Sequence, residues 1–471
     1  MSTLAVRPAP PPARVAPAGR RARLDSRVRF GSGVALWAAL LLVTWWWAAD
    51  GGLRDLGGWA SGLTSAGRLT GLVASVLLLV QVLLMARVPV LERAFGQDGL
   101  AAVHRTVGFV SFTGMLAHIG LVTWGYAAGD LFATPGTLWD LTWDTPGMLL
   151  AAAGTACLVL VVVTSVRAAR VRLRYESWHL LHLYAYLGAG LALPHQLWTG
   201  QEFTASTART VFWWGLWGAA LGAVLLWRVA LPVARSVRHR IVVTAIVPEG
   251  DGSVSVHLAG HRLHALGARA GQFLTWRFLT GSGWTRGHPY SLSAAPDGRA
   301  LRITVKDLGD GSAAVAGLRP GTRVLVEGPF GRLTAHARTA PDVLLIGAGV
   351  GITPLRALVE EFVHDPAGPG RVTLVHRFAD EPLFARELTA LSAGGRCELV
   401  PVAGPRRRDD SWLGHGVGPG DDLAALRARV PDLAHRDVYV CGPTPWTALV
   451  VRTLAAGGVP ADRVHVEHFG W

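Results

Sequence analysis

Five histidines lie within two otherwise apolar stretches of the chain, residues 101–125 and 176–198. They are His104, His118, His179, His182 and His195. Ionisable side chains inside a membrane span are costly and usually mark a functional site. A neutral imidazole nitrogen is a suitable ligand for iron. The residue types therefore point first to a metal or a metal cofactor held inside a membrane.

The spacing of these histidines predicts two levels of ligands. His118 follows His104 by 14 residues, which is about 21 Å along a helix and within about 40° of one face. His195 follows His182 by 13 residues, about 20 Å, but about 140° out of phase, so we assume that Gly188, Gly190 and Pro194 bend the helix. An imidazole from each of two helices at each of two heights is the arrangement that ligates two stacked haems. His179 lies one turn from His182, and on geometry alone either residue could be the inner ligand.

Six apolar runs are long enough to position these ligands in a bilayer, which needs about 20 residues per helix. They are residues 31–49, 67–86, 101–125, 147–166, 176–198 and 210–233. Arginines crowd residues 167–174 and follow the sixth run, whereas loop 126–145 has three aspartates and no basic residue. Positive loops stay inside, so we expect both termini to be cytoplasmic. His104 and His182 then form the inner pair, and His118 and His195 the outer pair.

The composition supports a membrane protein with soluble domains. The 471 residues are 51% hydrophobic and only 16% charged, which is too apolar for an ordinary soluble chain. The net charge is +13, but the arginines cluster beside apolar stretches and indicate topology and not nucleic-acid binding. Three cysteines define no metal spacing and no disulfide framework.

The pattern changes twice after the last apolar run. Short alternating runs predict an antiparallel β-barrel, and from about residue 340 apolar strands alternate with helices and predict a parallel nucleotide-binding sheet. The expected fold is a six-helix transmembrane bundle followed by these two domains. The expected boundaries are a disordered basic Pro-rich tail at 1–30, a transmembrane domain at 31–237, a barrel at 238–338 and a parallel-sheet domain at 339–471.

A strand of the predicted barrel is suited to a flavin. It carries His288, Pro289, Tyr290 and Ser291, and the tyrosine ring could stack on an isoalloxazine while the serine hydroxyl makes polar contacts. Downstream, Gly311 and Ser312 open a probable helix whose free N–H groups could bind a pyrophosphate. A packed core tyrosine and an ordinary serine N-cap are the alternatives.

A glycine-rich turn after an apolar strand predicts a dinucleotide site. Glycines let the backbone approach a pyrophosphate, and a proline is well placed in a first helical turn. The residues are Gly347, Gly349, Gly351, Thr353 and Pro354. The spacing is not the G-x-G-x-x-G of dehydrogenases.

Two further segments belong with this turn. About ninety residues on, Cys441, Gly442 and Pro443 end another apolar strand; a buried structural cysteine is the alternative for Cys441. Arg377, after a strand, could pair with a 2′-phosphate, which favours NADPH over NADH, although a surface arginine is equally ordinary.

Together these motifs resemble the ferric reductase and NADPH oxidase superfamily, over about residues 31–471. The family places its inner haem ligand seven residues after a tyrosine, here Tyr175, which selects His182. The resemblance implies a flavin site at His288–Ser291, a Gly-x-Gly-x-x-Pro nicotinamide element, and Cys441, Gly442 and Pro443 near the nicotinamide.

The family's ferredoxin-NADP reductase-like module implies that a terminal aromatic, Trp471 or Phe469, covers the flavin. Animal NADPH oxidases carry a further histidine where this chain has Val122, so oxygen is in doubt as the acceptor.

The resemblance implies a multi-pass oxidoreductase of the cell membrane with FAD, two b-type haems and NADPH or NADH. Electrons would pass from cytoplasmic NAD(P)H to a small acceptor on the outer face, a ferric chelate or oxygen. The expected partners are this acceptor and membrane lipid, with no nucleic acid; the oligomeric state is not readable. The alternatives are a membrane-anchored ferredoxin-type reductase that serves a redox protein, and a channel or transporter that senses NAD(P)H.

Overall fold

The chain folds into two compact units. The computed structural model describes residues 18–166, 175–280, 286–405, 410–413 and 422–469. Residues 24–230 form one unit, which we call the helical unit, and residues 231–471 with the first 23 residues form the other, the sheet unit. The predicted domain boundaries at 237/238 and 338/339 stay predictions.

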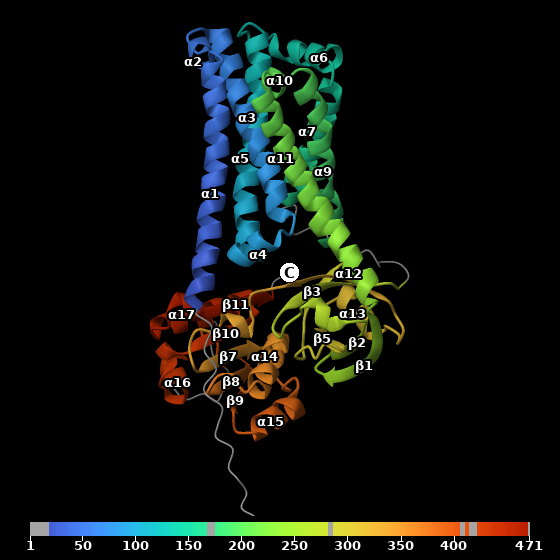
Figure 1. Ribbon diagram of the computed structural model, residues 1–471, viewed down its shortest axis with the longest axis vertical. Coiled ribbons are helices and arrows are strands. Elements are labelled where there is room, and N and C mark those ends of the chain that lie inside the picture. The colour runs from blue at the N-terminus through green and yellow to red at the C-terminus, as the bar shows by residue number, and fades with distance from the viewer. Residues whose placement is uncertain (1–17, 167–174, 281–285, 406–409, 414–421, 470–471) are drawn as a thin grey trace, which may run out of the picture. The chain divides into compact units, whose positions relative to one another are not determined.

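The helical unit consists of long apolar helices joined by short ones (Figure 1). Its described elements are α1 (Ala18–Ala49, which begins before the unit), α2 (Gly52–Asp55), α3 (Trp59–Met85), α4 (Pro89–Phe95), α5 (Gln97–Tyr126), α6 (Thr134–Asp144), α7 (Met148–Ser165), α9 (Tyr175–Trp198), α10 (Gln201–Thr204), α11 (Thr207–Ala223) and the π-helix η1 (Val224–Ala230).

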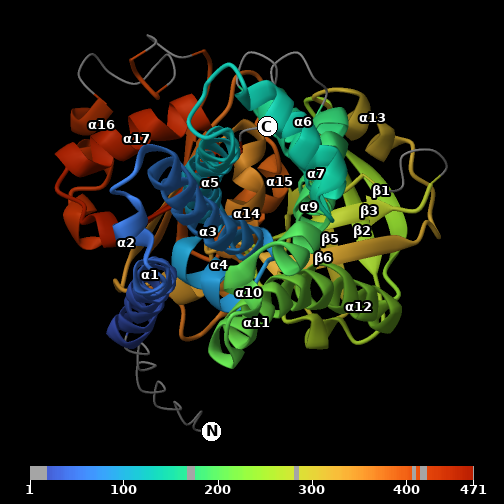
Figure 2. The same ribbon diagram turned by 90° about the horizontal axis from the view of Figure 1, so that it is seen from above.

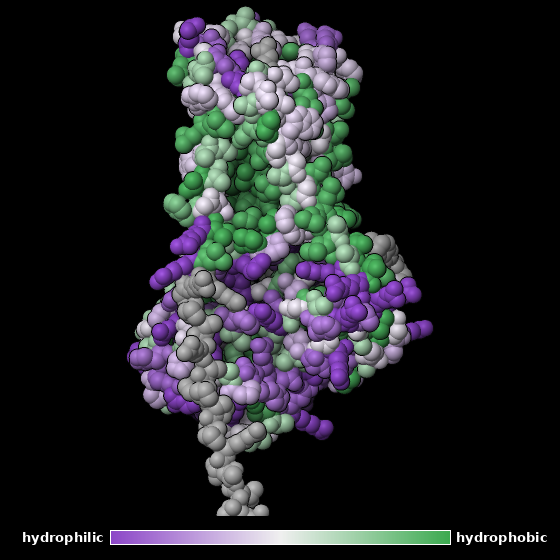
Figure 3. Space-filling view, in the orientation of Figure 1, coloured by the Kyte–Doolittle hydropathy of each residue, from purple (hydrophilic) through white to green (hydrophobic). Residues whose placement is uncertain are grey.

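Five helices are long and apolar enough to cross a membrane. They are Arg23–Ala49, Trp59–Met85, Gln97–Tyr126, Met148–Ser165 and Thr207–His239, and they correspond to five of the six predicted spans. Apolar side chains form the surface of the helical unit over the middle of these helices (Figure 3). The sixth predicted span also forms a helix, α9, but is not among the five. Its histidines, Gln196 and Pro194 lower its hydropathy, so its crossing stays a prediction.

Two pairs of helices pack along each other, α3 with α5 and α7 with α9 (Figure 2). Glycines allow the close approach in both pairs. A Cβ on Gly154 of α7 would lie 2.7 Å from the Gly188 carbonyl oxygen of α9, and a Cβ on Gly67 of α3 would lie 2.7 Å from a methyl group of Val122 on α5. The two histidine-bearing helices, α5 and α9, are therefore each fixed by a glycine contact with a neighbour.

The first part of the sheet unit holds two antiparallel three-stranded sheets. After α12 (Leu231–His239) come β1 (Val242–Gly250), β2 (Ser253–Ala259), β3 (Phe273–Phe278), β4 (His288–Ser291), β5 (Ala300–Lys306), α13 (Asp310–Ala316) and β6 (Val324–Phe330). The strand orders are β1-β2-β5 and β4-β3-β6. Bridges Val242–Arg323 and Leu292–Ile303 connect the two sheets, which share one core. The antiparallel pairing agrees with the prediction, whereas a continuous barrel stays a prediction.

The second part is a parallel five-stranded sheet, as predicted. It contains β7 (Val343–Ala348), β8 (Val372–Arg377), β9 (Cys397–Val402), β10 (Asp437–Pro443) and β11 (Val464–Phe469), in the order β11-β10-β7-β8-β9. Helices α14 (Ile352–His364) and α15 (Ala385–Ala393) cover one face, and α16 (Asp422–Arg429) and α17 (Thr444–Ala456) the other. Every residue of β7 is buried, as expected of a central strand covered on both faces.

The strand order reverses between β7 and β10. In open parallel sheets of this kind, ligands bind outside the carboxyl ends of the strands at this switch point. The glycine turn Gly349–Gly351 follows β7 directly, and Cys441–Pro443 end β10. The topology therefore brings together the two segments that the sequence assigns to the nucleotide.

Candidate cofactor sites in the two units

The two inner histidines lie on different helices, and their rings are close together. The rings of His104 on α5 and His182 on α9 have centroids 6.1 Å apart with planes inclined at 62°. An imidazole nitrogen binds a transition metal at about 2.0 Å, so two ligands on opposite sides of one iron place their ring centres about 6 Å apart. The observed separation fits one iron between the two rings.

Three of the four histidines place Nδ1 against a backbone carbonyl oxygen. A carbonyl oxygen only accepts, so Nδ1 carries the proton and donates, which leaves the Nε2 lone pair available for a metal. The pairs are His104 with Gln81 at 3.2 Å, His118 with Gly67 at 2.8 Å and His195 with Ala192 at 2.5 Å. This tautomer is the one that a metal-ligating histidine needs.

The carbonyl partners of His104 and His118 come from one repeating contact between α3 and α5. His104 meets Gln81, Ser111 donates to the Ala74 carbonyl at 2.9 Å, and His118 meets Gly67. Each step of seven residues forward along α5 is matched by seven residues back along α3, which is two helical turns in an antiparallel pair. The 14-residue spacing of the two histidines is therefore the spacing of two carbonyls on the neighbouring helix.

His182 differs, because its partner is a side chain. Its Nδ1 lies 3.3 Å from the Ser165 hydroxyl at the end of α7, and the Trp178 indole N–H donates to the same hydroxyl at 3.2 Å. The Trp178 and His182 rings are 4.9 Å apart. Sequence reasoning did not find Ser165 or Trp178, since neither has a spacing that marks it.

The outer pair also comes from α5 and α9. His118 lies on α5 and His195 near the end of α9, 14 and 13 residues after the inner pair. Gly71 of α3 lies against the His118 ring: a Cβ there would stand 2.5 Å from Nδ1. Gly147, before α7, lies against the backbone of His195, where a Cβ would approach to 3.0 Å. A larger residue at Gly71 would displace the His118 ring, and one at Gly147 would displace the backbone of His195.

An ion cluster around the buried Arg209 joins several helix ends. The Arg209 guanidinium on α11, 8% exposed, donates to Asp50 after α1 and, at 2.6 Å, to Glu202 on α10. Arg68 on α3 donates to Glu202 at 2.7 Å. The side-chain bond from Arg209 lowers the pKa of Asp50 against the opposing effect of burial. Sequence reasoning did not identify this cluster, whose members are up to 159 residues apart.

The two predicted flavin segments meet in the sheet unit. β4 pairs with β3, so that Tyr290 lies opposite Leu274 and His288 opposite Trp276. The His288 and Tyr290 rings are parallel within 8° at 5.9 Å. Gly311 lies against the His288 ring, where a Cβ would come within 3.1 Å of Cε1. Burial raises the pKa of Tyr290 to about 12, so its phenol stays neutral.

The turn around Ser312 is built locally. Its hydroxyl accepts from the Leu308 N–H at 2.8 Å and donates to the Gly309 carbonyl at 2.8 Å. The N-cap of α13 is Gly309, with φ +143° and nothing within 4 Å of where a Cβ would stand. Ser312 therefore stabilises the turn, and the space beside Gly309 is open.

The predicted nucleotide turn is packed on one side and open on the other. A Cβ on Gly351 would overlap the Cys441 carbonyl, and one on Gly347 would lie 2.9 Å from Leu355. Gly349 has φ +53° and open space around it. Thr353 donates to the Val350 carbonyl at 2.5 Å, and Pro354 is buried in the first turn of α14. The backbone at Gly349 is therefore open on one side.

Cys441 is fully buried in β10, beside Gly347 of β7. Burial is the largest cause that raises the pKa of its thiol, which therefore stays protonated. Gly442 lies against the Trp446 ring, and Pro443 is exposed at the strand end. In the sheet, Pro443 pairs with Phe469, so β11 ends beside the end of β10. Trp471 lies outside the described residues.

Arg377 is held at the carboxyl end of β8. It donates to the Gly404 carbonyl at 3.1 Å. Next to it, His376 is 1% exposed, and burial lowers its pKa to about 4. Both residues lie at the carboxyl end of β8, beside the strand that the glycine turn follows.

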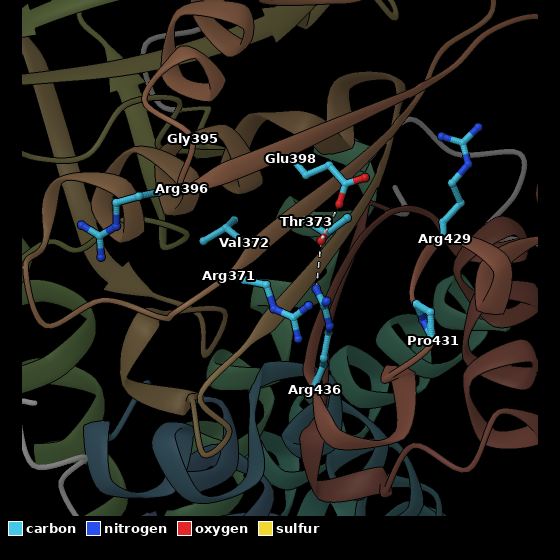
Figure 4. Close-up of a pocket in the computed structure, with 9 residues that line it drawn as sticks. All are labelled: Arg371, Val372, Thr373, Gly395, Arg396, Glu398, Arg429, Pro431 and Arg436. Carbon is cyan, nitrogen blue, oxygen red and sulfur yellow. Dashed lines mark hydrogen bonds between the residues drawn. The ribbon is translucent and has the colours of Figure 1, made fainter.

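A pocket of about 180 Å³ lies at the opposite edge of the parallel sheet (Figure 4). Its lining includes Arg371, Arg396, Arg429, Arg436, Glu398 and Thr373. Figure 4 shows Thr373 between Glu398 and Arg436, with a hydrogen bond to each. Asp432 accepts from Arg371 at 2.7 Å and from Arg436 at 2.9 Å. These arginines therefore stabilise the amino ends of the strands and take no part in the glycine-turn site.

Comparisons with known proteins agree with this division. Residues 70–193 match the family model "Ferric reductase like transmembrane component", and residues 345–451 match "Oxidoreductase NAD-binding domain". The matches confirm the predicted combination of a ferric reductase-like transmembrane region with an NAD-binding oxidoreductase region.

Several curated relatives are similar over about half of the chain. The ferredoxin reductase component of a 3-ketosteroid-9-alpha-monooxygenase from Mycolicibacterium smegmatis is 33% identical over 47% of this chain and 59% of its own length. A flavohemoprotein from Xylella fastidiosa is 30% identical over 47% of this chain and 53% of its own. The chain thus spans less than two thirds of either relative.

Among solved structures, the flavohem-like FAD/NAD binding domain of a nitric oxide dioxygenase from Vibrio cholerae is similar. It is 24% identical, with a TM-score of 0.38, over 49% of this chain and 99% of that domain.

Proposed function

We propose that this oxidoreductase takes electrons from cytoplasmic NAD(P)H and passes them through the helical unit to an acceptor on the extracytoplasmic side. The proposal rests on one observation above all. His104 and His182, from two different helices, face each other at the distance that a single iron requires.

The helical unit would hold two b-type haems. His104 and His182 would ligate the inner one, and His118 and His195 the outer one. Backbone carbonyls of Gln81, Gly67 and Ala192 keep the proton on Nδ1 of three of these residues, so that Nε2 stays free. This role requires α9 to cross the membrane beside α5 as the sixth span.

The sheet unit would bind FAD and the nicotinamide nucleotide. When bound, FAD accepts two electrons as a hydride and the haems carry them singly. β4 would present Tyr290 as a neutral ring to the flavin, and the turn at Gly311 and Ser312 would bind the pyrophosphate. Burial keeps the Cys441 thiol protonated and uncharged, and the end of β10 would lie beside the nicotinamide. Phe469 or Trp471 would cover the flavin.

The nucleotide turn would bind NADPH in preference to NADH. The glycine turn lets the backbone approach the pyrophosphate, with Thr353 and Pro354 opening the helix behind it. Arg377, at the end of the neighbouring strand, would pair with the 2′-phosphate. The ratio of kcat/KM for NADPH over NADH, in Arg377→Ala against the parent, tests this choice.

The acceptor would be a small molecule at the outer face. A ferric chelate is favoured over oxygen, because Val122 stands where animal NADPH oxidases carry a histidine. Stopped-flow reoxidation of the reduced protein with ferric citrate, oxygen or a soluble quinone distinguishes these acceptors. Reoxidation by none of them would refute a small-molecule acceptor.

An absorption spectrum of the purified protein tests the proposal directly. We expect b-type haem bands that NADPH reduces, and loss of about half of the haem in His118→Ala. A matched control is His364→Ala, a change at the end of α14 in the sheet unit. Absence of haem bands, or unchanged haem in His118→Ala, would refute the ligand assignment.

A membrane-anchored ferredoxin-type reductase that serves a redox partner protein is the second candidate. The similarity to ferredoxin reductase components of monooxygenases favours it. It predicts membrane helices that bind no haem, so the same absorption spectrum would show no haem bands. A channel or transporter that only senses NAD(P)H predicts no consumption of the nucleotide.

A further inference from the structure

Four charged side chains form a cluster between the antiparallel sheets and the parallel sheet of the sheet unit. They are Arg302 on β5, Arg356 and Glu360 on α14, and Glu387 on α15. Arg302 donates to both oxygens of Glu387, at 2.7 and 2.9 Å, and Arg356 contacts Glu387 at 2.7 Å. Arg356 also donates to Glu360. We call these four residues the charged cluster.

The charged cluster holds one short backbone segment, Ser293–Ala295. The Ser293 carbonyl accepts from Arg302 at 2.9 Å and from Arg356 at 3.1 Å, and its hydroxyl accepts from Arg302 at 3.1 Å. The Ala295 N–H donates to Glu360 at 2.7 Å. Ser293 is fully buried, so these bonds fix the backbone without competing water.

The segment Ser293–Ala295 lies close to the flavin strand β4 in the sequence, and Arg356 of the charged cluster lies close to the nucleotide turn. Ser293 follows two residues after the end of β4, the strand of Tyr290. Arg356 follows five residues after Gly351, in the helix that the glycine turn begins. The cluster therefore connects the flavin strand to the nucleotide turn through a few residues on each side.

The charges of the cluster balance inside the protein. Arg302 and Arg356 are 8% and 7% exposed, and two carboxylates compensate them. Burial raises the pKa of Glu387, but its bonds to Arg302 and the charge of Arg356 outweigh this and lower the pKa overall. Removing the charge of Glu387 would leave two buried guanidiniums with Glu360 alone, which loosens a buried ion pair.

We propose that the charged cluster is a positioning device that sets the distance and angle between the flavin strand and the nucleotide turn for hydride transfer. This rests on the proposed function. In the step it serves, the nicotinamide C–H bond breaks and its hydrogen leaves with both electrons. The flavin gains that hydride and the nucleotide becomes oxidised. Misplacement by about 1 Å slows such a step about 100-fold, whereas binding depends on contacts elsewhere.

The test uses Glu387→Gln and the conservative Glu387→Asp in the full chain, with Glu398→Gln as a matched control on β9. Stopped-flow reduction of the flavin gives the limiting rate and the nucleotide Kd. In Glu387→Gln we expect the limiting rate to fall about 10-fold or more, the nicotinamide–flavin charge-transfer absorbance to weaken, and the Kd to change less than about 3-fold. Glu387→Asp restores part of the rate, and Glu398→Gln matches the parent.

A second measurement needs neither nucleotide nor flavin. Hydrogen–deuterium exchange of the peptide that contains Ser293–Ala295 becomes faster in Glu387→Gln than in Glu398→Gln, since the cluster protects the Ala295 amide. If Glu387→Gln does not fold, Glu387→Asp carries both measurements, with a smaller decrease in rate and faster exchange.

The proposal is overturned by an unchanged limiting rate, by unchanged exchange, or by a rate that falls only in proportion to flavin lost. If NAD(P)H does not reduce the flavin of the parent protein, the proposed function fails instead. The two failures are therefore distinct.

Discussion

At the scale of single residues, the protonation of the imidazoles decides what the helical unit binds. A neutral imidazole has one donor and one acceptor nitrogen, and only the acceptor ligates a metal. In His104, His118 and His195, a hydrogen bond to a backbone carbonyl makes Nδ1 the donor. His182 relies on Ser165, a hydroxyl that both donates and accepts. The four candidate ligands therefore differ in how firmly their tautomer is set.

Gly71→Ala tests the packing of the outer pair. The added methyl carbon would stand 2.5 Å from Nδ1 of His118, so the ring must move away from the Gly67 carbonyl. We expect the outer haem to be lost, or its reduction potential to shift, with the inner haem retained. Redox titration of the haem absorbance measures this. Gly120→Ala on α5, where nothing lies within 4 Å, is the control and leaves both haems unchanged.

Asp437 shows how a single buried carboxylate makes stability depend on pH. Burial raises its pKa, but hydrogen bonds from His465 and from the Ala340 and Thr339 amides outweigh burial and lower the pKa below 3.8. The stabilisation is complete above the unfolded-state value and is lost as pH falls through the lower folded-state value.

Asp437→Asn should therefore cost about 1–3 kcal/mol at pH 7, and less as the pH falls below about 4. Hydrogen exchange of β7 and β10 at pH 7 and pH 3.5 measures the difference. Asp462→Asn, at an exposed position, is the control. An equal cost at both pH values would contradict the assignment.

At the scale of elements, register determines which motifs meet. The contact between α3 and α5 repeats every seven residues on each helix. The two histidines, 14 residues apart, therefore lie at two heights along the pair. In the parallel sheet, the neighbouring positions of β7 and β10 bring Gly347 beside Cys441, although 94 positions separate them in the sequence. The switch point is thus a consequence of strand order.

Gly351→Ala tests the switch point. A methyl group there would overlap the Cys441 carbonyl, so the glycine turn must move away from β10. We expect reduction of the flavin by NADPH to fall at least about 10-fold, while reduction by dithionite is unaffected. Gly394→Ala, after α15, has open space around it and should match the parent. Stopped-flow absorbance of the flavin measures both variants.

At the scale of the whole molecule, the charges of the loops predict the orientation in the membrane. Arginines gather in residues 167–174 and after α11, and aspartates in the loop between α5 and α7. Under the proposed function, electrons from a cytoplasmic nucleotide would then pass outward from the inner pair to the outer pair.

Labelling of intact cells tests this orientation. An impermeant maleimide should label Asp140→Cys on α6 from outside, and Arg238→Cys on α12 only after the cells are permeabilised. The parent chain gives the background, since its described cysteines are buried or half-buried. Labelling of Arg238→Cys in intact cells would contradict the predicted orientation and would indicate that the nucleotide site lies outside the cell.

The sequence by itself determined the classes of element and their motifs. Hydropathy and the 3.6-residue period identify the apolar helices and the two histidine heights, and residue types identify the glycine turn, because these signals are local. It left open whether His179 or His182 is the inner ligand, and it required a bend in α9 to align His182 with His195.

Only the tertiary structure decided which groups face one another. It places the His182 ring opposite His104, and it shows that backbone carbonyls of α3 set the tautomers of His104 and His118. Every residue has a carbonyl, so no residue type marks these partners in the sequence. The charged cluster and the Arg209 cluster join residues far apart in the chain, and such contacts depend on packing that no local pattern encodes.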